Sequence, residues 1–160
     1  MPVSVDHESV DHKLEVEVLL QSSRMVVSSS GEAKIRNLLQ QGIDWDFLIR
    51  TAHYHRVLPL LYQTLCHVAS DSVPEWAMVS LRKRFHANAQ RNLFLLAELL
   101  QILHLLGEHH IPAVPYKGPI LSVVLYGDVS LRQFSDLDII VPAENAVYYT
   151  HLTLPTIYSV

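Results

Sequence analysis

The feature that most constrains this fold is a long stretch without helix breakers. Between Glu75 and Glu108 the sequence contains no proline, and its only glycine is Gly107. Apolar residues recur along this stretch at helical spacing, which predicts a single long helix. Its second half is apolar except for a narrow polar stripe that includes Arg91 and Glu98. We therefore expect most of the circumference of this helix to be buried against other elements.

Shorter helical segments precede the long one. The run from Lys13 alternates like a strand in its first half, but its glutamates and adjacent leucines favour a helix. A serine-rich break at residues 28–30 predicts the start of a helix over residues 32–41. Asp44 predicts the N-cap of the next helix, and Pro59 is placed as expected for the first turn of another. The N-terminal part of the chain is thus predicted to be helical.

The pattern changes after His110. Residues 111–116 form a short extended segment whose two prolines confine it to a sheet edge or a strand end. A turn at residues 117–119, a helix over 120–126, a loop at 127–130 and a strand over 137–141 follow. The predicted fold class is α+β, with a loose N-terminus at 1–12, a helical domain at 13–108 and a strand–turn–helix–strand region at 109–145.

Composition excludes several classes of protein. The 160 residues include 12 Lys and Arg, 16 Asp and Glu and one cysteine, Cys66, which we expect to be buried. An intramolecular disulfide is impossible, and the net charge of −4 gives no basic field, so DNA is not expected as a partner. We see no secretory signal and no apolar run of membrane-spanning length. These features predict a cytoplasmic protein without a membrane partner.

The most informative short motif is Asp136-Leu137-Asp138, which enters the predicted strand. Residues i and i+2 of a strand face the same way, so the two carboxylates are expected side by side. Such a pair repels unless a cation lies between its members, and oxygen ligands favour Mg²⁺ or Mn²⁺. A bare Asp-x-Asp is otherwise more typical of a solvated loop.

A second motif lies upstream, where Lys117-Gly118-Pro119 opens a helix. Glycine lets the backbone approach a ligand, the helix N-terminus favours an anion, and Lys117 adds positive charge. Alone, the motif would be typical of a plain strand-to-helix turn. Followed by paired acids on a neighbouring strand, it predicts a site for a metal–triphosphate.

The run from Pro115 to Val141 resembles the uncharacterised nucleotidyltransferase family of the polymerase-β-like superfamily. The resemblance is carried by the Lys-Gly turn, by Leu125-Tyr126, and by Arg132 followed by Ser-Asp-hydrophobic-Asp at residues 135–138. Helical motifs, among them residues 44–46, 56–62 and 88–92, are similar as well. The resemblance extends over roughly residues 13–142, and it identifies residues 109–145 as part of a nucleotidyltransferase core.

The resemblance implies roles for six residues. Asp136 and Asp138 would bind Mg²⁺ (or Mn²⁺) as catalytic carboxylates, while Lys117 and Gly118 would hold the nucleoside triphosphate (NTP). Arg132 and Ser135 match the family pattern as further phosphate-binding residues, although a structural ion pair for Arg132 and a local turn or cap for Ser135 are the alternatives. The implied reaction transfers a nucleoside monophosphate from an NTP to a hydroxyl-type acceptor, which can be a small molecule, a protein or RNA.

The last residues change character. Residues 146–160 carry no charge and resemble translated adapter sequence, so we expect a non-native tail and a natural protein that continues further. The superfamily uses a third carboxylate on a later strand, and Glu144 lies too close to Asp138 to supply it. The 160-residue chain is accordingly expected to be a truncated and inactive form.

Two other functions remain open at the level of sequence. One is a non-catalytic helical interaction module with a degenerate nucleotide-binding site. The other is a metal-dependent glycosyltransferase with an Asp-x-Asp motif, in which the acids follow a nucleotide-sugar-binding α/β unit. The position of Asp136 and Asp138 after a Lys-Gly turn and a helix counts against the second.

Overall fold

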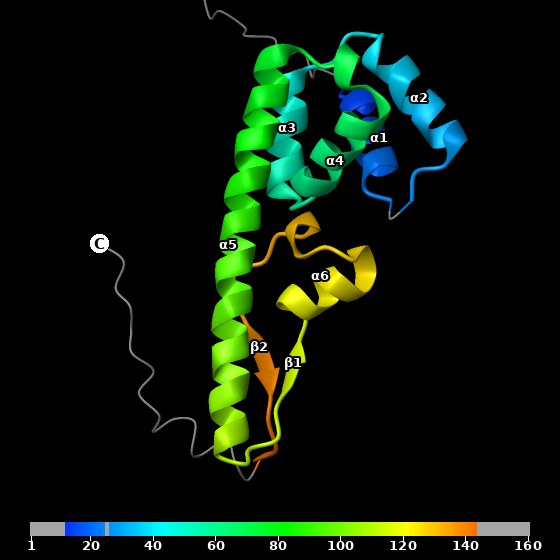
Figure 1. The fold of residues 1–160 in the computed structure, drawn as a ribbon. Helices are drawn as coiled ribbons and strands as arrows, with labels where there is room; N and C mark the ends of the chain where they lie inside the picture. Colours follow the sequence, from blue (N-terminus) through cyan, green and yellow to red (C-terminus); the bar gives the residue numbers. More distant parts are fainter. Residues whose placement is uncertain (1–11, 25, 144–160) are drawn as a thin grey trace, which may run out of the picture. The chain divides into compact units, whose positions relative to one another are not determined.

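Local sequence signals set the boundaries of the elements in the computed structural model, which describes residues 12–24 and 26–143 (Figure 1). The described residues form helices α1 (Lys13–Ser22), α2 (Ser29–Leu39), α3 (Trp45–Tyr54), α4 (Leu58–Val68), α5 (Glu75–Glu108) and α6 (Gly118–Tyr126), 3₁₀ helices η1 (Ser70–Ser72) and η2 (Val129–Leu131), and strands β1 (Val114–Tyr116) and β2 (Asp138–Ile140).

Side-chain caps explain where two of the helices begin. The hydroxyl of Ser28 accepts a hydrogen bond from the Gly31 amide at 3.2 Å, and α2 starts at the next residue, Ser29. A carboxylate oxygen of Asp44 accepts a hydrogen bond from the Phe47 amide at 2.9 Å at the start of α3. Both caps satisfy amides that have no partner within the helix. The predicted cap at Asp44 is confirmed.

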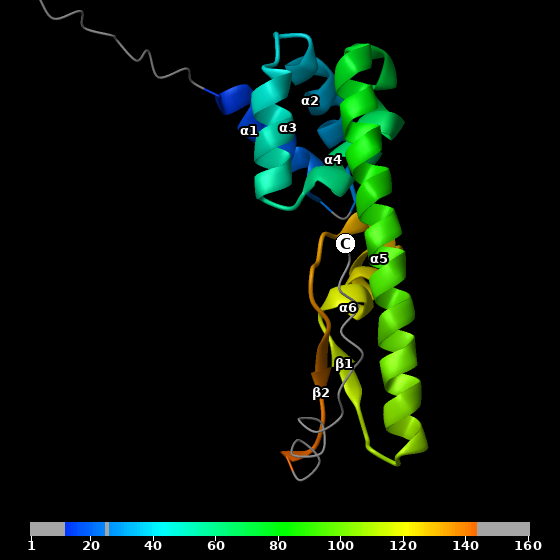
Figure 2. The same ribbon diagram turned by 90° about the vertical axis from the view of Figure 1, so that its left-hand side faces the viewer.

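The chain divides into two compact units, Met1–His86 and Ala87–Val160, and the boundary falls within α5. In the first unit, α1–α4 lie together beside the first turns of α5 (Figure 2). All of these segments contribute to one apolar core. The best-buried large side chains of this core are Val18, Ile35, Leu48, Leu58, Leu61, Leu65 and Leu81. This unit is a helical bundle stabilised by apolar burial. The domain boundary predicted at residues 108 and 109 remains a prediction.

The second unit contains the sheet. Strands β1 and β2 pair antiparallel, with Val114 opposite Ile140, Pro115 opposite Ile139 and Tyr116 opposite Asp138 (Figures 1 and 2). Helix α6 begins directly after β1 and the single residue Lys117. Gly127, with φ of 70°, ends α6 in the left-handed conformation that glycine adopts at low cost. The α+β fold class predicted from the sequence is confirmed.

Three expectations are corrected by the structure. The two strands are shorter than the predicted segments 111–116 and 137–141. The second half of α5 is not mostly buried, because Leu93, Phe94 and Leu100 are each more than half exposed. Two short strands and α6 provide too little surface to cover a helix of this length. Cys66, which was expected in the core, is exposed on α4.

None of the helices in the described part of the chain combines the length and apolar character needed to cross a bilayer. The predicted non-native tail, residues 146–160, lies outside the described residues.

Candidate functional site

The turn between β1 and α6 has an unusual backbone. Lys117 has φ of 57° and ψ of −140°, and Gly118 has φ of 43°. Positive φ is easy for glycine but costs a residue with a side chain roughly 1–3 kcal/mol. Such strain is concentrated at functional sites, where the surrounding structure maintains it. The lysine of the predicted phosphate-binding turn therefore sits in a conformation that glycine would adopt more easily.

The start of α6 leaves few backbone donors free. The Leu121 amide donates to the Lys117 carbonyl at 3.2 Å, which is the first hydrogen bond of the helix. Helix geometry leaves the amides of Gly118 and Ile120 without a partner within the helix, and Pro119 has no N–H. Of these two amides at the positive end of the helix dipole, that of Ile120 belongs to an exposed residue and that of Gly118 to a buried one.

The antiparallel register brings the turn to the carboxylates. Asp138 opens β2 opposite Tyr116, the last residue of β1, and Lys117 follows directly. As a result, Nζ of Lys117 lies 3.9 Å from Oδ2 of Asp138. Both side chains are about half exposed, at 54% and 45%, so their charges remain accessible to a ligand. The structure therefore places a cation and a carboxylate of the predicted site together.

The second carboxylate precedes the strand. The expectation that Asp136 and Asp138 lie on one strand is wrong for Asp136, because β2 begins only at Asp138. The backbone of Asp136 nevertheless approaches the turn closely. A Cβ atom at Gly118 would lie 3.4 Å from the Asp136 carbonyl oxygen. That distance is an ordinary van der Waals contact, so the positive φ, and not a lack of space, favours glycine at residue 118.

Arg132 also reaches the turn. Its Nη1 donates a long hydrogen bond of 3.5 Å to the Gly118 carbonyl. Within the described residues it forms no ion pair with Asp136 or Asp138, so the structural ion pair considered for it is not observed there. Ser135 is exposed in the irregular segment before β2, and the structure gives it no contact with the turn. Lys117 and Gly118 thus form the turn, and the side chains of Arg132 and Asp138 reach it. Asp136 approaches it through its backbone carbonyl.

Sequence reasoning assigned no role to three buried polar side chains near these residues. Asn88 and Asn92 on α5 and Ser122 on α6 all bind backbone carbonyls of the loop at 128–132. No signal in the sequence marks the asparagines, because they lie in a polar stretch of α5 that includes Arg84, Gln90 and Arg91 and is typical of a solvated helix face. Their partners could not be identified without the fold.

The donor set is suited to a hard divalent cation. Among the described residues, His, Cys, Asp and Glu form no group of three or more that would hold a metal. Mg²⁺, however, is commonly bound by one or two carboxylates while phosphates and water supply the other ligands. Asp136 and Asp138, both reachable from solvent, fit this pattern when a triphosphate is bound next to them.

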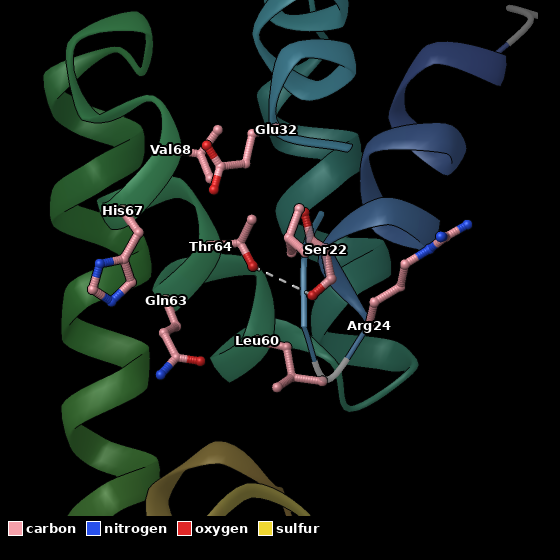
Figure 3. A pocket seen from close by; sticks show the side chains of 9 residues that line it. Ser22, Arg24, Glu32, Leu60, Gln63, Thr64, His67 and Val68 are labelled. Atoms are coloured by element: carbon pink, nitrogen blue, oxygen red, sulfur yellow. Dashed lines mark hydrogen bonds between the residues drawn. The ribbon is translucent and has the colours of Figure 1, made fainter. Parts of the chain in front are cut away.

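A separate pocket of about 190 Å³ lies in the helical unit (Figure 3). Its polar tips do not converge, since the guanidinium of Arg24 and the ring of His67 point to opposite sides (Figure 3). It holds none of the predicted site residues. The pocket is lined by Ser22, Arg24, Val27, Glu32, Leu60, Gln63, Thr64, His67 and Val68.

The described chain is therefore an α+β protein in which a cationic strand-to-helix turn meets a carboxylate on the paired strand. The family described as uncharacterised nucleotidyltransferase matches residues 41–150, about two thirds of the sequence, and the chain belongs to this family. The match includes the turn, both carboxylates and the upstream helices from α3 onward. No curated protein and no solved structure matches the chain. Family membership supports a nucleotidyltransferase function with an NTP as substrate.

Proposed function

We propose that the protein transfers a nucleoside monophosphate from an NTP to a hydroxyl-type acceptor in a reaction that depends on Mg²⁺ or Mn²⁺. The acceptor is a small molecule, a protein or RNA. The observation that carries the proposal is the contact across the β1–β2 pair, where Nζ of Lys117 lies 3.9 Å from Oδ2 of Asp138. Opposite charges of this kind at a helix N-terminus are what a metal–triphosphate requires.

In this proposal, the turn binds phosphate. The amides of Gly118 and Ile120 donate to phosphate oxygens, and Lys117 contributes a positive charge next to them. Arg132, which already reaches the Gly118 carbonyl, has further N–H donors for the same phosphates. Ser135 supplies a hydroxyl in the segment that leads to the carboxylates. Together these donors orient the triphosphate.

The carboxylates of Asp136 and Asp138 hold the divalent ion. When bound, this ion neutralises phosphate charge and lowers the pKa of an attacking hydroxyl. Without ligand, the ammonium group of Lys117 forms an ion pair with Asp138. When a triphosphate binds, the same ammonium group gains a partner of higher negative charge. Most of the rate enhancement in such a site comes from positioned charge and not from covalent catalysis.

On this proposal, we expect little catalytic turnover by the 160-residue chain. The resemblance implies a third carboxylate that helps to activate the acceptor oxygen, whereas this proposal assigns only two metal-binding carboxylates among the described residues, Asp136 and Asp138. Activation of the nucleophile contributes of the order of 10²–10⁴ in rate. Incubation with labelled NTP, Mg²⁺ and a mixture of acceptors should therefore give little labelled product. Robust transfer that Asp136→Asn abolishes would contradict this expectation.

Calorimetric titration with each NTP, with and without Mg²⁺, tests the binding part of the proposal. The unmodified chain should bind only when the ion is present, and Asp138→Asn should weaken binding by about tenfold to a hundredfold, as expected for loss of a charged ligand. Asp46→Asn is the matched control, since Asp46 is an exposed acid on α3. Equal affinities for the unmodified chain and Asp138→Asn would refute the assignment.

A further inference from the structure

Helix α5 carries two buried amide side chains whose role the reaction does not yet explain. Asn88 is 7% exposed and Asn92 is fully buried. They lie one helical turn apart, so they share one face of α5. Burial of an amide costs free energy unless the amide is hydrogen-bonded, which means that the partners of these two side chains indicate what they do.

In the described part of the chain, the hydrogen bonds of both NH₂ groups go to one loop, while Oδ1 of Asn92 is buried without a partner. Asn88 Nδ2 donates to the Ser130 carbonyl at 2.9 Å and to the Arg132 carbonyl at 3.3 Å. Asn92 Nδ2 donates to the carbonyls of Val129 and Arg132, both at 2.7 Å. The Arg132 carbonyl thus accepts hydrogen bonds from both amides. Because carbonyl oxygens only accept, both NH₂ groups must face the loop.

Helix α6 holds the same loop with a third buried side chain. The hydroxyl of Ser122, which is fully buried, lies 2.9 Å from the Asp128 carbonyl and 3.3 Å from the Val129 carbonyl. Within the loop, Oδ1 of Asp128 accepts hydrogen bonds from the amide and the hydroxyl of Ser130. The backbone from 128 to 132 is therefore fixed mainly by side-chain donors.

This loop leads directly to the candidate site. The side chain of Arg132 reaches the Gly118 carbonyl at the start of α6, while its backbone is held by the two asparagines. Phe134, which is 5% exposed, anchors the chain two residues later. Asp136 and Asp138 follow. A shift of the Arg132 backbone would therefore move an arginine at the phosphate-binding turn and the segment that carries both carboxylates.

We infer that Asn88 and Asn92 are positioning residues that set the geometry of nucleotide binding by fixing the backbone of Arg132. This inference rests on the proposed function, because it concerns the same site. Neither asparagine is expected to touch the nucleotide. Their contribution is to hold Arg132 and the carboxylate segment in the arrangement that binds a metal–triphosphate.

The test compares Asn92→Ala and Asn88→Ala with a matched control, Asn37→Ala, which removes an exposed amide from α2. Two quantities are measured well below the melting temperature of each variant. The first is the affinity for an NTP with Mg²⁺. The second is hydrogen exchange of peptides spanning residues 128–138, relative to peptides from α1–α4.

We expect Asn92→Ala to weaken NTP binding by about tenfold or more, as a small misplacement of binding groups can. Exchange should become faster in residues 128–138 and remain unchanged in α1–α4. Asn37→Ala should change neither quantity. Arg132→Ala combined with Asn92→Ala should weaken binding by less than the product of the two separate effects, because the asparagine acts in part through that arginine.

Two results would overturn the inference. One is a lower melting temperature for both asparagine variants with an unchanged NTP affinity, which would show a structural role only. The other is unchanged exchange in residues 128–138. If the unmodified chain binds no NTP with Mg²⁺, the proposed function fails, and the exchange measurement still decides whether the asparagines hold the loop.

Discussion

The two units of this chain bury their apolar side chains to different extents. In the first unit, most leucines and isoleucines of α1–α4 and the start of α5 are almost completely buried, and Leu20 is an exposed exception. In the second unit, many large apolar side chains are exposed, including Leu93, Phe94, Leu100, Val114, Tyr116, Val123, Val124 and Ile140. Its buried positions include polar residues that bind backbone carbonyls. The stability of the first unit therefore depends mainly on apolar burial, and that of the second depends more on hydrogen bonds.

The difference has an energetic meaning. A fully buried leucine contributes about 1.5–3 kcal/mol, whereas a typical hydrogen bond contributes about 0.5–1.5 kcal/mol net. The second unit, which carries the candidate site, is therefore expected to open more readily than the first. A site with low local stability can adjust to a ligand, and a ligand that binds it should in turn stabilise it.

Two leucine-to-alanine substitutions, one in each unit, test this difference in burial, and the first should have the largest effect on stability. Leu61→Ala removes a fully buried side chain from the core of the first unit and should lower the free energy of unfolding by about 2–5 kcal/mol. Leu93→Ala removes a side chain that is 56% exposed on α5 and should cost about 0.5 kcal/mol or less. Urea unfolding followed by circular dichroism measures both. Similar losses for the two variants would break the comparison.

The turn allows a second test, in which stability and binding are expected to change in opposite directions. Lys117→Gly relieves the positive φ and should leave stability unchanged or raise it by about 1 kcal/mol, while NTP binding weakens because the ammonium group is lost. Thermal melts and calorimetric titration measure the two effects.

Gly118→Ala should lower stability, in contrast to Lys117→Gly. The φ of 43° at Gly118 should make an alanine destabilising by about 1–2 kcal/mol. A lower stability for Lys117→Gly, or a neutral Gly118→Ala, would show that the turn is not strained as the backbone indicates.

The smallest effect concerns an exposed ion pair in the first unit. The hydrogen bond from Lys34 holds the pKa of Glu17 below its usual value of 4.5, and a second hydrogen bond, from Gln21, acts in the same direction. A lowered pKa in the folded state stabilises the fold above the unfolded pKa, and this contribution is lost as pH falls through the folded pKa.

Urea midpoints of the unmodified chain and of Glu17→Gln test this linkage. Their small difference at neutral pH should disappear in acid, below the lowered pKa of Glu17. Lys34→Met should show the same dependence on pH. A difference that persists in acid would mean that Glu17 acts through packing and not through its charge.

The helical part of the fold was predictable because its signals are local. The long helix follows from the absence of breakers between Glu75 and Glu108, and Asp44 marks the start of α3 through its own side chain. Burial was less predictable, since it depends on what covers each face. Leu93 and Cys66 lie in apolar helical patterns, yet both are exposed in the structure.

The candidate site was predictable in its residues but not in its geometry. The turn at Lys117 and the acids at Asp136 and Asp138 are visible as short motifs. The register that places Lys117 next to Asp138 depends on pairing between strands separated by α6 and a loop, which no local pattern specifies. The buried amides of Asn88 and Asn92 act over an even longer separation along the chain.

Pro115 determines which edge of the small sheet can pair with a further strand. It pairs with Ile139, and because proline has no N–H, the hydrogen bonds between the strands must run through Val114 and Tyr116. The nitrogen of Pro115 therefore faces away from β2, and the outer edge of β1 lacks its central donor. Any strand that extends this sheet, from this chain or from another, is expected to join at β2, beside the carboxylate of Asp138.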